Sequence, residues 1–180
     1  MLMTYTECVS KYGNAYQIEK LIERGILVKL EEGLYSDKAD CSELSILVKK
    51  YPKAVLAGDY AFYYYGLTDL IPEKYTFATT SKAAPMTDSR VSQIYVRKDI
   101  FPLGIADAEI EDTRVRIYDR ERMLIELLRN KNAMPYDLYK EILLHYRKMI
   151  DSLEIWRIQE YAAIFPKSKL ISRALDEEVL

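Results

Sequence analysis

The sequence predicts an α+β protein built from two domains, and three observations support this. The chain has 180 residues, of which 49% are hydrophobic and 30% charged, as is typical of a globular protein. Residues 1–36 alternate helical and extended patterns around glycines. Three β-rich runs lie between residues 74 and 119, and helical patterns then occupy residues 120–180. We therefore expect a small domain over residues 1–40 and a mixed domain with a helical C-terminus over residues 41–180.

The N-terminal region is punctuated as two helices and a hairpin. Two helical segments lie on either side of a turn at Gly13 and Asn14. Asn14 is expected to cap the second helix with its side-chain oxygen, and Gly25 to supply the left-handed residue that ends it. Residues 26–36 then predict a β-hairpin around a Glu-Glu-Gly turn. This order of elements is that of a winged helix-turn-helix, whose second helix enters the DNA major groove.

The second helix is predicted to be amphipathic. Its buried stripe is expected to comprise Ala15, Ile18, Leu21 and Ile22. One polar flank comprises Tyr16, Gln17, Lys20 and Arg24. The carboxylates of Glu19 and Glu23 fall on the other flank. Glutamine can bond adenine and lysine can donate to guanine or phosphate, so these residues can act as a DNA-reading surface. The candidate DNA-binding residues are Asn14, Tyr16, Gln17, Lys20, Arg24 and, in the hairpin, Lys29.

Charge leaves a second interpretation of this helix open, in which its polar face is simply solvated. Residues 1–40 hold five lysines and arginines against seven aspartates and glutamates, and the whole chain has a net charge of −2. This balance excludes a protein that coats nucleic acid without sequence preference. With about three phosphate contacts per subunit, a monomer would bind weakly, so operator binding requires a homodimer on a two-fold site.

The segments after residue 36 predict the second domain. Ser42 is a capping residue ahead of a helical run that Pro52 ends, and we expect this run to lead into the second domain. The expected strands cover residues 74–80, 91–98 and 113–119. The expected C-terminal helices cover residues 120–130, 134–149, 153–165 and 167–179.

The stretch GDYAFYYYGL, residues 58–67, places five aromatic rings between two glycines. In a helix the rings fall on both sides, with Tyr60, Tyr63 and Tyr64 on one face and Phe62 and Tyr65 on the other. A platform for stacking bases needs rings on one exposed face, interleaved with cations. No lysine or arginine occurs between Lys53 and Lys74, so we predict that the rings belong to the core.

A local excess of basic residues distinguishes residues 81–98. It comprises Lys82, Arg90, Arg97 and Lys98, against Asp88 alone. Such a surface can contact an acidic partner or a second stretch of DNA backbone. The alternative is a solvated sheet edge, on which basic side chains protect against aggregation.

Enzyme motifs are absent from the sequence, and we expect no catalytic residue, metal or cofactor. His145 is the single histidine, and its helical context favours a packing role. The acidic residues Asp107, Glu109, Glu111 and Asp112 are interpreted as a solvated polar loop. A hydrolase acting through His145 or this cluster is the least favoured alternative. Cys8 and Cys41 lack the spacing of a disulfide or metal site, so buried thiols are expected.

Targeting signals are also absent. The first residues lack the basic segment and apolar run of a signal peptide, and no run of about 18 apolar residues occurs. We therefore expect a cytoplasmic protein without a membrane partner.

Three segments together resemble one protein family. They are LIERGILVKLEEGLYS (residues 21–36), LAGDYAFYYYGLTDLIPEKYTFATT (residues 56–80) and VRIYDRERMLIELLR (residues 115–129). In this order, with LEIWRIQEYAAIF and LISRALDEEV near the end, they are similar to the AbiEi-type antitoxins of bacterial type IV toxin–antitoxin (abortive infection) systems.

The resemblance implies two functions, one for each domain. The N-terminal domain would bind operator DNA and repress its own operon, and the C-terminal domain would counter a nucleotidyltransferase toxin encoded alongside. The toxin role is excluded for this chain, because Gly58 is followed by neither the serine nor the paired aspartates of a nucleotidyltransferase. The rival hypothesis is a protein-interaction module whose winged domain does not bind DNA.

Overall fold

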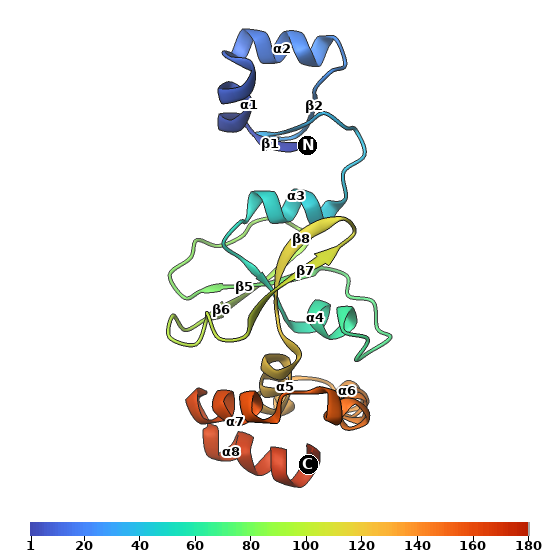
Figure 1. Ribbon diagram of the computed structural model, residues 1–180, viewed down its shortest axis with the longest axis vertical. Coiled ribbons are helices and arrows are strands. Elements are labelled where there is room, and N and C mark those ends of the chain that lie inside the picture. Colours follow the sequence, from blue (N-terminus) through green and yellow to red (C-terminus); the bar gives the residue numbers. More distant parts are fainter. Residues whose placement is uncertain (180) are drawn as a thin grey trace. The chain divides into compact units, whose positions relative to one another are not determined.

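The computed structural model describes residues 1–179, which form two compact units of mixed helix and strand. The first unit comprises Met1–Lys53 together with Glu109–Thr113, and the second comprises Ala54–Ala108 and the chain from Arg114 onward (Figure 1). Residues 41–53 thus belong to the first unit, which extends beyond the expected boundary after residue 40.

The first unit combines a three-stranded sheet with three helices. Its sheet has the order β1-β3-β2, and both strand pairs are antiparallel. Strand β1 was not predicted, because three residues are too few to show an alternating pattern. The elements are β1 (Leu2–Thr4), α1 (Tyr5–Tyr12), α2 (Ala15–Glu23), β2 (Val28–Glu31), β3 (Leu34–Ser36) and α3 (Glu43–Lys50).

Caps define both helices of the N-terminal pair. Thr4 and Glu7 form a capping box at the start of α1, in which each side chain accepts a hydrogen bond from the other's backbone N–H. The predicted cap of α2 is confirmed, since Asn14 Oδ1 accepts a hydrogen bond from the Gln17 N–H at 3.1 Å. Gly25 has a φ of 69°, which confirms the predicted left-handed residue after α2.

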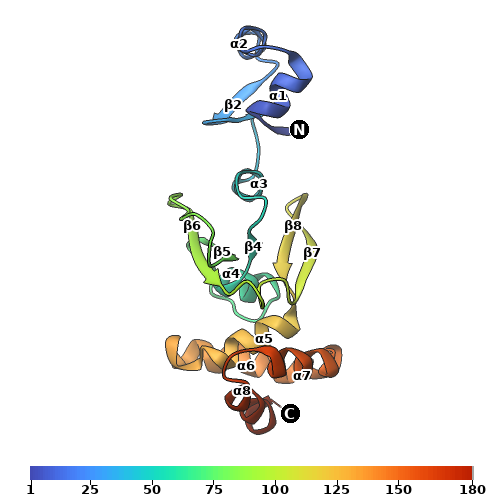
Figure 2. The same ribbon diagram turned by 90° about the vertical axis from the view of Figure 1, so that its left-hand side faces the viewer.

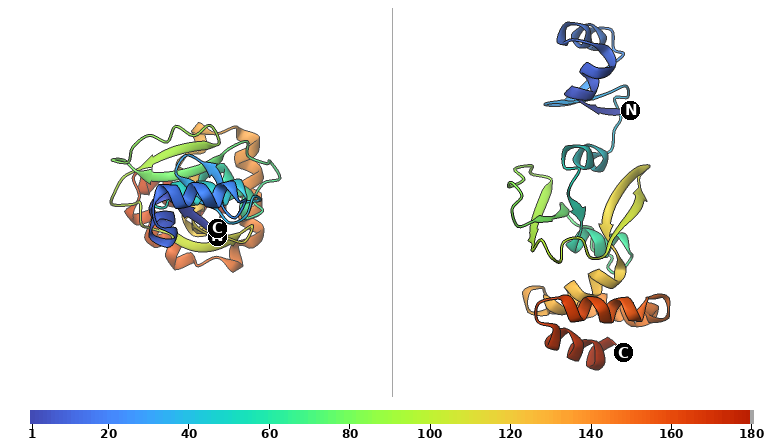
Figure 3. Two further views of the ribbon diagram at one scale, coloured as in Figure 1. Left: turned by 90° about the horizontal axis from the view of Figure 1, so that it is seen from above. Right: turned by 60° about the vertical axis from the view of Figure 1, so that its left-hand side comes forward.

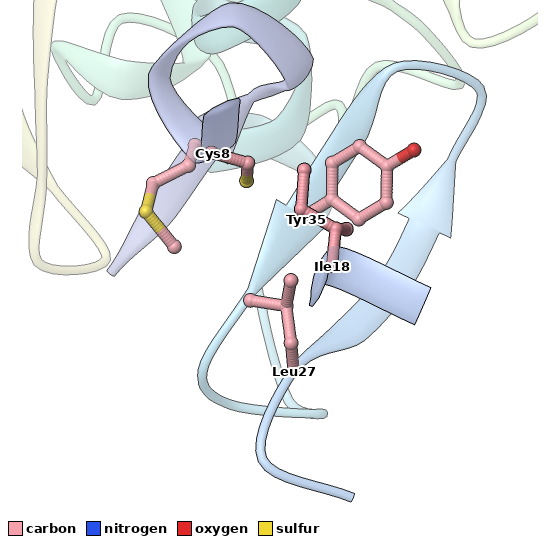
Figure 4. Close-up of a cluster of buried hydrophobic side chains, with 5 residues drawn as sticks. Cys8, Ile18, Leu27 and Tyr35 are labelled. Atoms are coloured by element: carbon pink, nitrogen blue, oxygen red, sulfur yellow. The ribbon is translucent and has the colours of Figure 1, made fainter. Parts of the chain in front are cut away.

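A small apolar core holds the first unit together. Met3, Cys8, Ile18, Leu27 and Tyr35 are buried, with Tyr12, Leu21 and Ile22 packed against them. Figure 4 shows the side chains of α1, α2 and β3 that converge there.

Two predictions about buried residues are wrong or only partly right. Ala15 is exposed, because it is the first residue of α2 and adjoins the solvated turn before that helix. Cys8 is a buried free thiol as expected, but Cys41 is only half-buried, and its Sγ donates to Ser36 Oγ at 3.3 Å.

Helix α3 is bound to the first unit by two ion pairs. Lys49 Nζ lies 2.7 Å from Glu7 Oε1, and Lys50 Nζ lies 3.3 Å from Glu31 Oε2. Ser42 caps the helix by accepting a hydrogen bond from Ser45 N–H, as predicted. The run expected to lead into the second domain is therefore a structural part of the first.

The second unit contains a five-stranded mixed sheet of order β6-β5-β4-β8-β7. β4 is antiparallel to β5 and parallel to β8, while β5 and β6 are parallel. Figure 2 shows β4 between the two outer strand pairs. All three predicted strands are present, and β4 and β7 are additional. The elements are β4 (Val55–Leu56), α4 (Gly58–Tyr64), β5 (Tyr75–Thr80), β6 (Val91–Val96), β7 (Ile105–Ile110) and β8 (Thr113–Tyr118).

The acidic cluster is not the polar loop that was predicted. Asp107 and Glu109 lie on β7, and Glu111 and Asp112 form the turn to β8 with φ values of 50° and 58°. Two successive positive φ values are those of a type I′ hairpin turn. The acidic side chains hid the alternating pattern of the strand, which caused the error.

Helices form the C-terminal end of the second unit, as predicted (Figures 1 and 3). Helix α5 is central, because its Met123, Leu124, Ile125, Leu127 and Leu128 are all almost fully buried. The α-helices are α5 (Arg120–Arg129), α6 (Tyr136–Met149), α7 (Ile155–Ile164) and α8 (Ser168–Ala174). Short 3₁₀ segments at Lys131–Ala133 and Ile150–Ser152 and a π-helical turn at Leu175–Val179 complete this part.

The aromatic stretch around α4 is only partly core. Phe62 is buried, and the half-buried Tyr65 donates from its hydroxyl to the Tyr118 carbonyl at 2.9 Å. Tyr60 packs on Tyr75, with ring centroids 4.9 Å apart. Tyr63 and Tyr64, however, are each 38% exposed, so the prediction that all five rings belong to the core is only partly right.

Candidate functional site

Helix α2 presents most of the predicted DNA-binding residues to solvent. Ile18 is buried, whereas Tyr16, Gln17, Lys20 and Arg24 are all exposed. The nine residues of α2 span about 14 Å at 1.5 Å per residue, which is long enough to cross a major groove about 12 Å wide. The structure thus brings these four side chains to one solvated helix.

Tyr16 and Lys20 form a pair on this surface. They are four residues apart, and the Lys20 Nζ lies 4.4 Å from the centre of the Tyr16 ring. Tyr16 is 61% exposed, so the contact holds an ammonium group against an aromatic face in water. Arg24 and Lys20 form no ion pair within residues 1–179 and keep their charge for an external anion.

The start of α2 is organised by Asn14, Gly13 and Gln17. Asn14 Oδ1 is engaged as the helix cap, which leaves its amide NH₂ as the free donor. Gln17 lies against the turn, because a Cβ on Gly13 would stand 2.0 Å from Gln17 Oε1. Gly13 also has a φ of 100°, so this turn requires glycine. Asn14 thus has a structural role, and because its oxygen serves as the cap, its amide NH₂ is the group that remains to contact a DNA base.

Lys29 is less available than the residues of α2. Its Nζ lies 2.9 Å from Glu32 Oε2, and this hydrogen bond raises the lysine pKa. A phosphate would have to displace Glu32 to take the ammonium group.

Several carboxylates of the first unit are neutralised within it. Glu7, Glu31 and Glu32 pair with Lys49, Lys50 and Lys29, and Asp37 pairs with the N-terminal ammonium. The hydrogen bond from Lys49 and those from Thr4 hold the pKa of Glu7 at about 2. Between residues 1 and 53 the chain has eight lysines and arginines and eight aspartates and glutamates, so residues 41–53, with Lys49, Lys50 and Lys53 against Glu43, cancel the acidic excess of residues 1–40.

The basic residues of the second unit are partly compensated. Arg90 pairs with Asp88 at 2.7 Å, and Arg97 pairs with Asp99. Asp99 directly follows the basic segment 81–98 and supplies a second carboxylate there. The exposed Lys82 and Lys98 remain, so the predicted basic surface is weaker than its sequence suggested.

His145 has a packing contact. Its Nδ1 lies 2.8 Å from the Leu67 carbonyl oxygen, which can only accept, so Nδ1 carries the proton. Within residues 1–179 no group of three or more histidine, cysteine, aspartate or glutamate side chains is arranged to hold a metal ion. None of the helices there is both long and apolar enough to cross a bilayer.

Comparisons with known proteins identify a shared fold. No family model and no curated protein matches this chain. The crystal structure of the RV2827C protein from Mycobacterium tuberculosis is similar, with a TM-score of 0.64 at 16% sequence identity. The similarity covers 98% of this chain and 71% of that one. At this identity the likeness concerns the mixed α and β fold alone.

Proposed function

We propose that this protein is an operator-binding repressor that uses α2 as its recognition helix. The observation that carries the proposal is the orientation of α2, which buries Ile18 and exposes Tyr16, Lys20 and Arg24. A two-residue turn joins α1 to α2, and a β-hairpin follows. We interpret this unit as a winged helix-turn-helix in which β1 pairs with the hairpin.

Electrostatics support a local rather than a general affinity for DNA. Ion pairs with Lys49, Lys50 and Lys29 neutralise carboxylates of the same unit. Lys20 and Arg24 then supply the charge on α2, opposed by Glu19 and Glu23 on its other flank. With so few cations on α2, one subunit alone would bind DNA weakly. The protein is therefore proposed to act as a homodimer on a two-fold operator in the bacterial cytoplasm.

We also propose a role for the C-terminal unit, which is that of an antitoxin. The three segments that resemble AbiEi-type antitoxins suggest that the protein counters a nucleotidyltransferase toxin encoded beside it. This unit has its own sheet and helical core, so it can act separately from α2. Its exposed Lys82 and Lys98, with Arg90 and Arg97, are the proposed contacts for an acidic partner or a DNA backbone.

A gel shift with the DNA upstream of the gene tests operator binding. We expect the double substitution Lys20→Glu and Arg24→Glu to weaken binding at least about tenfold, because two phosphate contacts become repulsive. The matched control is Lys11→Glu with Lys38→Glu, which reverses two exposed charges of the same unit outside α2. Equal loss in both variants would indicate a general charge effect instead of a recognition helix.

A protein-interaction module without DNA binding is the second candidate. The balanced charge of residues 1–53 and the pairing of Lys29 with Glu32 favour it. Under this hypothesis the wild-type protein does not shift the upstream DNA, and charge reversal on α2 changes nothing. Co-expression with the neighbouring open reading frame then tests the antitoxin role separately, by growth of the host.

A further inference from the structure

The loop after α4 exposes two consecutive aliphatic side chains. Leu70 is 61% and Ile71 is 71% exposed, and both belong to the second unit. A single exposed aliphatic residue is ordinary, but two adjacent ones beside a hollow are typical of an interaction surface. In the sequence they form the apolar centre of TDLIPE, a stretch that otherwise has the composition of a polar turn.

The loop is held in place by α6. His145 Nδ1–H donates to the Leu67 carbonyl at 2.8 Å, and Asp69 N–H donates to Glu141 Oε1 at 3.1 Å. Thr68 between them is only 5% exposed, and its Oγ accepts from Leu70 N–H. The two aliphatic side chains are thus presented by a fixed backbone, which lowers the entropic cost of binding.

A groove of about 410 Å³ opens beside this loop. Ile71, Pro72 and Leu138 supply its accessible apolar wall, and the almost fully buried Phe62 and Ile142 lie behind them. This volume is within the range of pockets that accept side chains or small ligands. The groove therefore has room for apolar anchors of a bound peptide segment.

Carboxylates dominate the charge around the groove. Asp59 and Glu73 line it together with a single cation, Lys74. Asp69 on the same loop and Asp137, next to Leu138, are also exposed. Within residues 1–179 none of these four carboxylates forms an ion pair. The rim attracts a basic segment, and it disfavours pairing with the same acidic face of a second copy.

We propose that this groove docks a partner protein through a segment that combines an aliphatic or aromatic anchor with lysine or arginine. The anchor packs against Ile71 and the apolar wall, and the cations pair with Asp59 and Glu73. This inference goes beyond the proposed repressor function, because it involves neither α2 nor DNA.

Peptide display on the intact protein tests the proposal. A random 16-residue library is selected against the wild-type chain, and the enriched peptide is then measured by fluorescence anisotropy. We expect enriched peptides to contain a large apolar residue and an excess of lysine and arginine. Ile71→Asp is expected to lower the affinity for the enriched peptide at least about tenfold, because a carboxylate replaces the aliphatic side chain that contacts the anchor.

Matched variants separate the groove from general surface effects. Leu170→Asp introduces the same charge at a 50% exposed leucine of α8 and is expected to leave affinity unchanged. Asp59→Asn with Glu73→Gln is expected to weaken binding several-fold and to reduce its salt dependence. Asp151→Asn with Glu160→Gln removes two exposed carboxylates outside the groove and is the charge control.

Four outcomes overturn the proposal. They are a selection that enriches no peptide, an enriched set without excess cations, equal binding by wild type and Ile71→Asp, and a wild-type dimer that Ile71→Asp converts to monomer. The last outcome would mean that a second copy covers the face. Gel shifts with upstream DNA are expected to be the same for wild type and Ile71→Asp, so this test and that of the repressor function fail independently.

Discussion

The guanidinium carbon of Arg122 lies 4.1 Å from the centre of the Phe165 ring, inside the second unit. The centre of the Tyr118 ring lies 4.4 Å from the same guanidinium carbon. Arg122 is fully buried, and it donates to the Ile100 carbonyl at 2.7 Å and to Glu126 Oε1 at 2.9 Å. One side chain thereby connects the segment after β6, helix α5 and the end of α7.

Removal of this cation is expected to destabilise the second unit. Burial lowers the pKa of Arg122, while Glu126 opposes that shift and stabilises the charged form. Arg122→Met would remove the guanidinium donors to Glu126 Oε1 and to the Ile100 carbonyl in a buried site, and we expect a loss of about 3 kcal/mol in unfolding free energy. Urea denaturation followed by circular dichroism measures this loss.

The matched control for that substitution is Arg173→Met. Arg173 forms an ion pair with Glu177, but its side chain is 77% exposed. Its removal is expected to leave the unfolding free energy nearly unchanged, because water screens an exposed ion pair. Similar losses in both variants would show that the buried position of Arg122 has no special energetic role.

Gly104→Ala tests the close approach of backbone to Arg122. A Cβ on Gly104 would stand 2.5 Å from the Arg122 Cβ, and its φ is 74°. We expect a loss of about 2–4 kcal/mol, from steric overlap added to left-handed strain. Gly66→Ala is the control, because its φ is 66° with nothing within 4 Å, so strain alone should cost about 1 kcal/mol. Equal melting temperatures for the two variants would contradict the predicted steric overlap at Gly104.

Asn14 provides a test that separates capping from DNA contact. Asn14→Ala is expected to cost about 1 kcal/mol, because Gln17 N–H loses its side-chain acceptor. Asn14→Ser keeps a capping oxygen but removes the amide donor. If Asn14 acts only as a cap, Asn14→Ser retains both stability and the gel shift. A variant that is stable but binds the upstream DNA more weakly would instead assign the amide a contact.

The stability of the first unit is expected to depend on pH through Glu7. Hydrogen bonds from Lys49 and Thr4 hold its folded-state pKa at about 2, below the ordinary value of 4.5. A depressed carboxyl pKa stabilises the fold above pH 4.5, and this contribution is lost as the pH falls toward 2. Because half of the side chain is exposed, the contribution is only about 1 kcal/mol.

Glu7→Gln measures this contribution, since glutamine also completes a capping box. The variant is expected to be less stable than wild type at pH 7, and the difference should vanish near pH 2. Denaturant midpoints across this range measure the effect, with Glu19→Gln as the control at an exposed carboxylate of α2. A difference that persists at pH 2 would assign the loss to packing instead of charge.

Local signals predicted much of the fold. Asn14, Gly25 and Ser42 mark helix ends through hydrogen bonds and dihedral angles that depend on neighbouring residues, so their roles are visible in the sequence. Strands β1 and β7 escaped prediction for different reasons. β1 has three residues and depends on pairing with β3, and the carboxylates of β7 resemble a solvated loop. Pairing with a distant segment decides β1, whereas β7 lies next to β8, which follows it after a two-residue turn.

The sequence predicted which residues of the candidate site are exposed, but it did not predict the ion pairs around them. The exposure of Tyr16, Lys20 and Arg24 follows from helical periodicity around Ile18. The pairing of Lys29 with Glu32 and the neutralisation of Glu7 by Lys49 do not, because they depend on where side chains meet in space. Residues Leu70 and Ile71 were passed over, since exposure of an aliphatic residue cannot be read from its identity.

The sequence by itself determined the helix ends marked by caps, three strands of the second unit, the amphipathic face of α2 and the absence of known catalytic motifs, because these depend on spacing along the chain. Tertiary structure alone decided that α3 belongs to the first unit, that Arg122 is buried between two rings, and that an acidic groove lies beside Ile71. The reason is that burial and ion pairing bring together residues that are far apart in the sequence, and local sequence patterns do not predict such contacts.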